Sequence, residues 1–482
     1  MQRSSRGKKG YTMDFSWKII IDAGIISTAL LVATFLRTKL KFLQKFMVPN
    51  ALTAGFILLP VYNYLMPALG YTQNRLGDLV YHLLSISFIA MTLRSRPASA
   101  RRKKDNSVWA MSTVIMSQYA IQAFLGLMLT WVFFSTIIPG LSPAFGLTLP
   151  LGFAMGPGQA YAIAKSWEPL GFAGAGSVGL TMAALGYLWA CVVGVILVNR
   201  GVRKGYLPSL ESLSNRTLRT GVIPADAVKP VGSRNTTDIE AIDPMSFHAA
   251  IVAFTYILSF VLLTGLGALL GLAGKVGRDL AYNLWGMNFI FSSLTAIVVR
   301  IVINRLKLGH LLDDDGLSRI SGMAIDYMVT GALAAISLVF VGQYWLPLLT
   351  ISTFGGVSVV FTVPWMCSRV FKDHRYERMV MLFGVSTGTL STGLALLRIV
   401  DPEFKTKVSG DYMLSAGMTF ALAIPFILAI NLPAQAGVQG SLGPFWNMVL
   451  ISLGYIVYAA VALAIVAKKR LFHKPSVAWL EE

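Results

Sequence analysis

Long apolar segments separated by short polar ones make up most of this 482-residue chain. A transmembrane helix needs about 20 mostly apolar residues to cross roughly 30 Å of hydrocarbon. Eleven segments satisfy this requirement, and we expect each to span a membrane. They are Trp17–Leu36, Phe46–Leu69, Leu79–Leu93, Val108–Ile138, Phe172–Val198, Met245–Leu272, Leu280–Ile303, Ile320–Val341, Trp345–Phe371, Asp411–Asn431 and Phe445–Ala467. The pattern predicts an all-α integral membrane protein.

Two further apolar segments, 147–165 and 380–398, are interrupted in the middle by Gly, Ser and Thr. Their sequences include FAMGPGQAYAIAKSWEP and FGVSTGTLSTGLALLRIVDP, and each ends with a cation followed three residues later by an acid and a proline. A non-helical backbone inside hydrocarbon is tolerated only beside water or packed protein. We interpret both segments as re-entrant hairpins that enter the membrane from opposite faces.

The positions of Lys and Arg indicate the orientation, because these residues concentrate on the cytoplasmic side. Placing the cluster at 94–104 in the cytoplasm puts most of the 41 Lys and Arg residues there, provided that both hairpins return to the face they entered. The basic tail at 1–16 falls on the other side, so either Met13 is the true start or the tail is translocated. We expect a multi-pass protein of the bacterial inner membrane.

A polar stretch at 201–244 carries charges of both signs, which is typical of a cytoplasmic linker between two halves. Residues 17–200 and 245–432 each hold five predicted spans and one hairpin. An odd number of spans reverses the insertion of the second copy, which predicts two inverted repeats. Residues 444–482 then add one extra span and a basic cytoplasmic tail.

Composition excludes several classes of protein. The chain is 55% hydrophobic and 13% charged with a mean hydropathy of +0.64, which excludes a soluble protein. The net charge of +19 lies in short clusters between apolar segments, so we expect lipid rather than nucleic acid as the partner. Cys191 and Cys367 lack the spacing of a disulfide or a thiolate metal site. No phosphate-binding loop, paired carboxylates or nucleophile constellation is present, so we expect neither ATP-driven transport nor an enzyme, and no cofactor.

The interrupted segments offer the chemistry of a transport site. Carbonyl and hydroxyl oxygens suit Na⁺, and half-helix N-termini suit a carboxylate. The candidate substrate-binding residues are Gly156, Gly158, Gln159, Thr387, Gly388, Thr389, Ser391 and Thr392. For the coupling ion we select Asp326 and Ser386, with an interfacial Asp326 bonded to Tyr327 or a hydroxyl as the alternative. Isolated glycines such as Gly186 and Gly194 are interpreted as packing positions.

The chain resembles the bacterial sodium/glutamate symporters of the glutamate:sodium symporter family. The resemblance rests on FLQKFMVPNALTAGFILLP, FAMGPGQAYAIAK, the span around Asp326 and the hairpin at 384–398. In the second hairpin, Thr389 and Ser391 match the family pattern, whereas Leu390 and Ala395 replace its proline and asparagine. The resemblance implies a homodimer that works by alternating access.

The sequence therefore predicts a secondary transporter that couples Na⁺ entry to uptake of glutamate or a related small carboxylate. A passive channel, or a membrane scaffold of the same fold that has lost coupling, is the alternative. Accumulation of solute against its gradient separates the two.

Overall fold

The computed structural model describes residues 17–46, 48–94, 106–207, 220–225, 227, 233–401, 406–468, 470 and 477–480, without the side chains of a few residues inside helices. The N-terminal tail at 1–16, most of the basic cluster at 94–104 and much of the predicted linker lie outside these residues. Ten described helices are long and apolar enough to cross a membrane. They are α1 (Lys18–Lys39), α3 (Asn50–Pro60) with the turns that continue it to Leu69, α4 (Gln73–Leu93), α5 (Asn106–Val132), α8 (Ala175–Arg203), α10 (Pro244–Gly271), α12 (Asn288–Arg305), α15 (Trp345–Val370), α18 (Val408–Ala429) and α20 (Gly443–Ala467). The protein is a multi-span helical membrane protein.

The eleventh predicted span belongs to α13 (Asp314–Ala334), which is not among the ten apolar helices. Its bounds differ from the predicted 320–341. The helix begins at Asp314 because the Asp313 side chain accepts a hydrogen bond from the Gly316 backbone N–H at 2.8 Å, which caps the first turn. It ends at Ala334, and the short α14 (Leu338–Gln343) follows.

A second difference concerns the predicted span 280–303. The chain there forms α11 (Gly274–Gly286) and α12, which are separated at Met287. The predicted span therefore begins within α11, whereas the helix long and apolar enough to cross a membrane is α12.

Large apolar side chains are exposed along the outer helices. Phe35 on α1 is 61% exposed, Phe260 on α10 is 56% exposed and Ile465 on α20 is 70% exposed. Soluble monomers rarely expose contiguous apolar surface on this scale. These faces are suited to contact with lipid chains.

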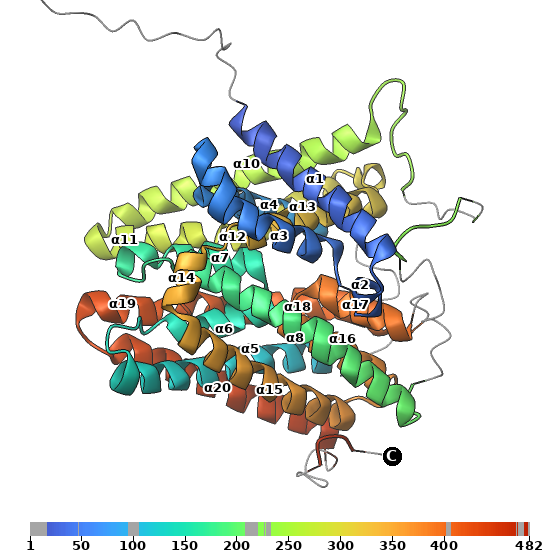
Figure 1. Cartoon of the computed structure of the whole chain (residues 1–482). Helices are drawn as coiled ribbons and strands as arrows, with labels where there is room; N and C mark the ends of the chain where they lie inside the picture. Colours follow the sequence, from blue (N-terminus) through green and yellow to red (C-terminus); the bar gives the residue numbers. More distant parts are fainter. Residues whose placement is uncertain are drawn as a thin grey trace, which may run out of the picture.

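The helices run between two ends of the molecule (Figure 1). We call the end where α8 finishes and α10 starts the linker end; it lies on the right of Figure 1. The opposite end, on the left, carries α11 and α19 (Leu432–Gln439). Between them α4 packs along α13, while α3 contacts α13 and α12 contacts α4.

Buried charges stabilise the linker end. The fully buried Arg378 donates to Asp411 at 2.6 Å. Nearby, Arg369 donates to the Val477 carbonyl at 2.8 Å, and the Trp479 ring lies 4.9 Å from that of Tyr376. The C-terminal residues 477–480 therefore pack back onto the helices of this end.

Both interrupted segments contain a break in helical structure. In the first, a π-helical turn ends at Met155, Gly156 adopts φ +96°, and α7 (Pro157–Lys165) follows. In the second, α16 (Arg375–Thr387) ends before Gly388, and α17 (Leu390–Val400) starts after Thr389.

Candidate functional site

The two breaks meet. A Cβ atom placed on Gly156 would lie 2.6 Å from Cγ2 of Thr389 and 3.9 Å from the Gly388 carbonyl oxygen. Segments far apart in the sequence are thus brought into contact at their non-helical points. We call this contact between Gly156, Gly388 and Thr389 the junction.

Residues of α5 and α8 surround the junction. The Gln122 amide on α5 donates to the Ser386 carbonyl at 2.9 Å. A Cβ on Gly186 of α8 would collide with the Thr387 carbonyl oxygen, so the absent side chain allows α8 to approach α16 closely. The next residue, Tyr187, directs its hydroxyl toward Thr389.

Three polar atoms around the junction have no hydrogen-bond partner within the described structure. They are Gln122 Oε1, Gln159 Oε1 and Ser386 Oγ. Their residues are only 0%, 6% and 1% exposed, respectively. An unsatisfied buried polar group costs about 1–3 kcal/mol, so three of them beside one contact indicate a place for a bound polar species.

Two helix N-termini also point at the junction. The first N–H groups of α7 and α17 have no acceptor within their own helices. No side chain caps α7, whereas the Thr389 and Thr392 side chains form a capping box at α17. Both helices direct the positive ends of their dipoles to the same region, which favours an anionic group there.

The candidate residues from the sequence occupy different positions around this site. Gly156, Gly388 and Thr389 form the junction, and Gln159 and Ser386 contribute unpartnered oxygens beside it. The Thr387 carbonyl contacts α8, as described above. The side chain of Ser391 lies outside the described part of the structure.

Two candidates have packing roles. The Thr392 hydroxyl accepts from the Thr389 N–H at 2.8 Å and donates to the Gly384 carbonyl at 2.8 Å, which holds α17 against α16. A Cβ on Gly158 would lie 2.7 Å from Leu84 and Met328, so this glycine lets α7 pack against α4 and α13.

Asp326 lies on an exposed polar face of α13. Asp315, Arg319, Gly322 and Asp326 are all exposed and follow one side of the helix from the linker end. Asp326 interacts electrostatically with Tyr187, whose hydroxyl faces the junction. The neighbouring Tyr327, which the sequence suggested as a partner for Asp326, instead pairs its hydroxyl with that of Ser27 at 2.6 Å.

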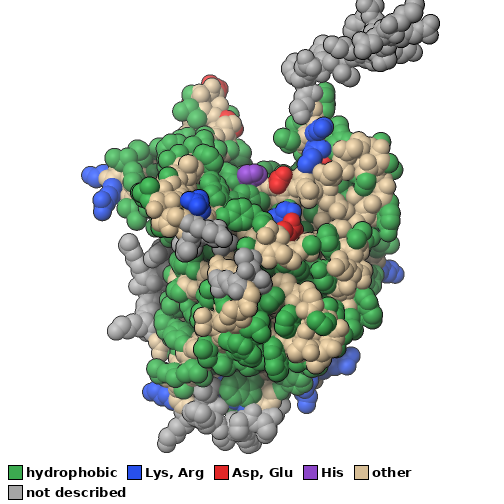
Figure 2. Space-filling model, turned by 90° about the vertical axis from the view of Figure 1, so that its left-hand side faces the viewer, with side chains coloured by type: hydrophobic (Ala, Val, Ile, Leu, Met, Phe, Trp, Pro, Cys, Tyr) green, Lys and Arg blue, Asp and Glu red, His purple; other side chains and the backbone are tan. Residues whose placement is uncertain are grey.

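A similar polar face on α4 starts from the opposite end. Asn74, Asp78 and His82 are exposed at intervals of four residues. Figure 2 views the molecule from this end and shows acidic, basic and histidine side chains together near the middle of a largely hydrophobic surface. Since α4 contacts α7, two polar faces lead from opposite ends toward the interrupted segments.

Other polar groups in the apolar helices have structural partners. The Asp22 carboxylate pairs with Arg75 at 2.5 Å and accepts from the Tyr62 hydroxyl at 2.9 Å. His248 is buried and accepts from the Asp313 backbone N–H at 2.7 Å, which ties the start of α10 to the start of α13.

Sequence reasoning missed Gln122 and Tyr187. Both lie within ordinary apolar spans, where no break in helical pattern marks them. The sequence does show a polar side chain deep in a predicted span at each of these positions. The same is true of Gln118, one turn before Gln122, which has a structural role, so this feature alone does not identify a site residue.

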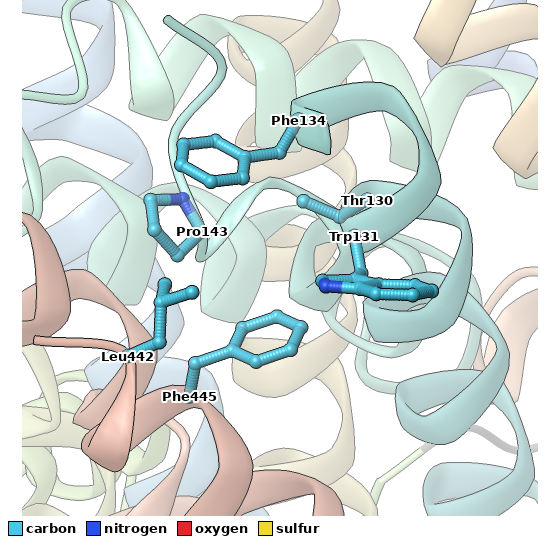
Figure 3. A pocket seen from close by; sticks show the side chains of 6 residues that line it. All are labelled: Thr130, Trp131, Phe134, Pro143, Leu442 and Phe445. Carbon is cyan, nitrogen blue, oxygen red and sulfur yellow. The ribbon is translucent and has the colours of Figure 1, made fainter. Parts of the chain in front are cut away.

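A separate hollow lies where α5 ends and α20 begins (Figure 3). Its lining is almost entirely apolar and aromatic: Thr130, Trp131, Phe134, Pro143, Leu442 and Phe445. It contains none of the candidate residues. Thr130 Oγ1 is the one buried side-chain polar atom of this lining without a hydrogen-bond partner in the described structure, whereas three such atoms lie around the junction, which remains the stronger candidate site.

Comparison with known proteins supplies no relative: no protein-family model, no curated protein and no solved structure matches this chain.

Proposed function

We propose that the protein is a secondary active transporter that carries a small carboxylate, coupled to Na⁺, by alternating access. The observation that carries this proposal is the junction, where two broken helices meet among three buried polar atoms that lack partners within the described residues. Broken helices that meet inside a membrane protein are a recurrent design for binding a solute and its coupling ion.

The two polar faces support alternating access. The face on α13 opens from the linker end and the face on α4 opens from the opposite end. A solute bound between them could be exposed to either side by movement of the interrupted segments against α4 and α13. Glycine contacts such as Gly158 against Leu84 keep that interface closely packed.

Inverted repeats are part of the proposal. Residues 17–200 would form one copy and residues 245–432 the other, with two re-entrant hairpins that point to opposite ends. Support comes from the central packing, because the contact of α3 with α13 has a counterpart in the contact of α12 with α4. The resemblance to sodium/glutamate symporters adds glutamate as the first solute to test and a homodimer as the expected assembly.

The carboxylate and the sodium ion would use different groups. The N–H groups of α7 and α17 suit the carboxylate of the solute. The Ser386 hydroxyl and the Asp326 side chain offer oxygen ligands suited to Na⁺. No covalent chemistry is needed. Within the described residues no group of three or more His, Cys, Asp or Glu side chains is placed to hold a metal ion.

Uptake into proteoliposomes tests this proposal. We expect an inward sodium gradient to drive accumulation of a labelled carboxylate or amino acid above its equilibrium level, and an ionophore that collapses the gradient to abolish it. Flux that only equilibrates would instead favour a passive channel, and no flux of any solute in a panel of amino acids and dicarboxylates would contradict transport.

Paired glycine variants link the activity to the junction. A Cβ on Gly388 would collide with Thr392, whereas one on Gly417 of α18 meets no atom within 4 Å. Gly388→Leu should therefore abolish uptake, and Gly417→Leu should retain it. Equal uptake by both variants would remove the junction from the mechanism.

A further inference from the structure

The Gln122 side chain has a defined orientation at the junction. A carbonyl oxygen only accepts hydrogen bonds, so the amide group that faces the Ser386 carbonyl at 2.9 Å must be the Nε2 donor. The Oε1 atom is left as a fully buried acceptor without a partner in the described structure. A bound species that donates an N–H or O–H group would satisfy it.

Gln159 provides a second acceptor of the same kind. It is the third residue of α7, and helical side chains lean toward the N-terminus of their helix, which here is the junction. Its Oε1 is likewise buried and unpartnered within the described residues. Two amide oxygens without donors suit an ammonium group, which carries three donors and no acceptor.

The remaining groups complete a zwitterion site. The N-termini of α7 and α17 favour a carboxylate, while the Asp326 carboxylate, which interacts electrostatically with Tyr187, favours positive charge nearby. The hydroxyls of Tyr187 and Ser386 can donate or accept, and Ser386 Oγ lacks a partner within the described residues.

On the described parts of the interrupted segments, no Lys or Arg lies close to the junction to pair with a second carboxylate of the solute. Lys165 is the last residue of α7, and Arg398 lies near the end of α17, so each is about 12 Å or more along its helix from the junction at 1.5 Å per residue. Arg378 is as far from Ser386 along α16. Lys165 and Arg378 are also paired with Glu168 and Asp411, each at 2.6 Å.

We infer that the solute is a zwitterionic amino acid with an uncharged side chain, its ammonium group held by Gln122 and Gln159 and its carboxylate by the N-termini of α7 and α17. This inference rests on the proposed transport function and narrows its substrate class. Glutamate, with a second carboxylate, becomes a poorer solute than alanine, serine or glutamine.

Matched solutes test the inference on the purified full-length protein. Binding is measured by thermal shift and by competition for uptake, with alanine, glutamine, glutamate, propionate and succinate. We expect alanine or glutamine to bind, and removal of the ammonium group, from alanine to propionate, to weaken binding about tenfold or more. Propionate or succinate that binds as well as alanine, or glutamate that binds better than glutamine, would overturn the inference.

Three glutamine variants give the residue-level test. Gln122→Met and Gln159→Met remove the unpartnered acceptors and should weaken alanine binding about tenfold, with little effect on propionate. Gln118→Met is the matched control, because Gln118 is equally buried on α5 but its Oε1 already accepts from Thr362 at 3.1 Å. Equal losses in all three variants would contradict the assignment.

The outcomes separate this inference from the transport proposal. Sodium-driven uptake of propionate or succinate would leave transport standing and remove the ammonium site. A complete lack of uptake for every solute would remove transport itself. If Gln122→Met does not fold, Gln159→Met and the solute comparison on the unmodified protein still show whether an ammonium group is bound.

Discussion

The contact between Gly156 and Thr389 can be tested by adding and removing single methyl groups. Gly156→Ala adds a Cβ that would lie 2.6 Å from Cγ2 of Thr389, about 1 Å closer than an ordinary contact. The next nearest atom, the Gly388 carbonyl oxygen, is 3.9 Å away. The collision is therefore with one methyl group, and Thr389→Ser removes that group while it keeps the hydroxyl that caps α17.

Two energies combine in the Gly156→Ala variant. The backbone at φ +96°, ψ 171° lies in a region that suits glycine, and its strain with alanine costs about 1–3 kcal/mol. Overpacking adds about 1–3 kcal/mol. Because Thr389→Ser relieves only the second cost, the double variant should recover about 1–3 kcal/mol relative to the sum of the two single variants.

Denaturant or thermal unfolding in detergent, followed by uptake in proteoliposomes, measures this coupling. Gly171→Ala is a control for a positive φ without a clash, since Gly171 has φ +98° and a Cβ added there would meet no atom within 4 Å. Additive effects of Gly156→Ala and Thr389→Ser would refute the direct contact between the two breaks.

Three further predictions concern charge. Arg378→Met should lower the free energy of unfolding by about 3–5 kcal/mol because it leaves Asp411 unpaired. Lys165→Met breaks a partly exposed pair and should lower the free energy of unfolding by less than about 1 kcal/mol. Equal unfolding midpoints for the two variants would contradict this difference. Asp326→Asn should change the sodium concentration for half-maximal uptake, and an unchanged value would exclude Asp326 as an ion ligand. Hydrogen bonds from Ser246 hold the pKa of Asp243 below its usual value, so its cap on α10 contributes at neutral pH and is lost as the pH falls through that lowered pKa. At neutral pH, amide hydrogen exchange at the start of α10 should therefore be slower in the unmodified protein than in Asp243→Ala, and in acid the two proteins should exchange alike. Equal exchange at neutral pH would contradict the cap.

The positions of the helices were largely predictable because apolar length decides them. Nearly every predicted span falls on a long helix, and both breaks fall inside the segments that Gly, Ser and Thr marked. The clearest error, α13, has a physical cause: its first turns carry Asp314, Asp315 and Arg319 on or near an exposed face, so hydropathy placed its start six residues late. Hydropathy alone does not detect helix caps or exposed polar faces.

The meeting of the breaks was not predictable in the same way. Contact between Gly156 and Thr389 depends on how α8 packs, and Gly186 shows why: its missing side chain admits the Thr387 carbonyl. We interpreted Gly186 from the sequence as a packing glycine, and that packing is what brings α16 to α8. Gln122 became a candidate only when its unpartnered oxygen was seen beside the breaks, and Tyr187 only when its hydroxyl was seen to face Thr389.

Solute protection of a single cysteine tests directly whether a transported solute binds at the junction. Thr389→Cys is introduced after Cys191 and Cys367 are replaced by serine, and its reaction with a small thiol reagent is followed with and without alanine or glutamine in the presence of sodium. We expect slower labelling when a transported amino acid is bound and no protection at a control cysteine placed at Gly417. Labelling of Thr389→Cys that no transported solute slows would contradict a binding site at the junction.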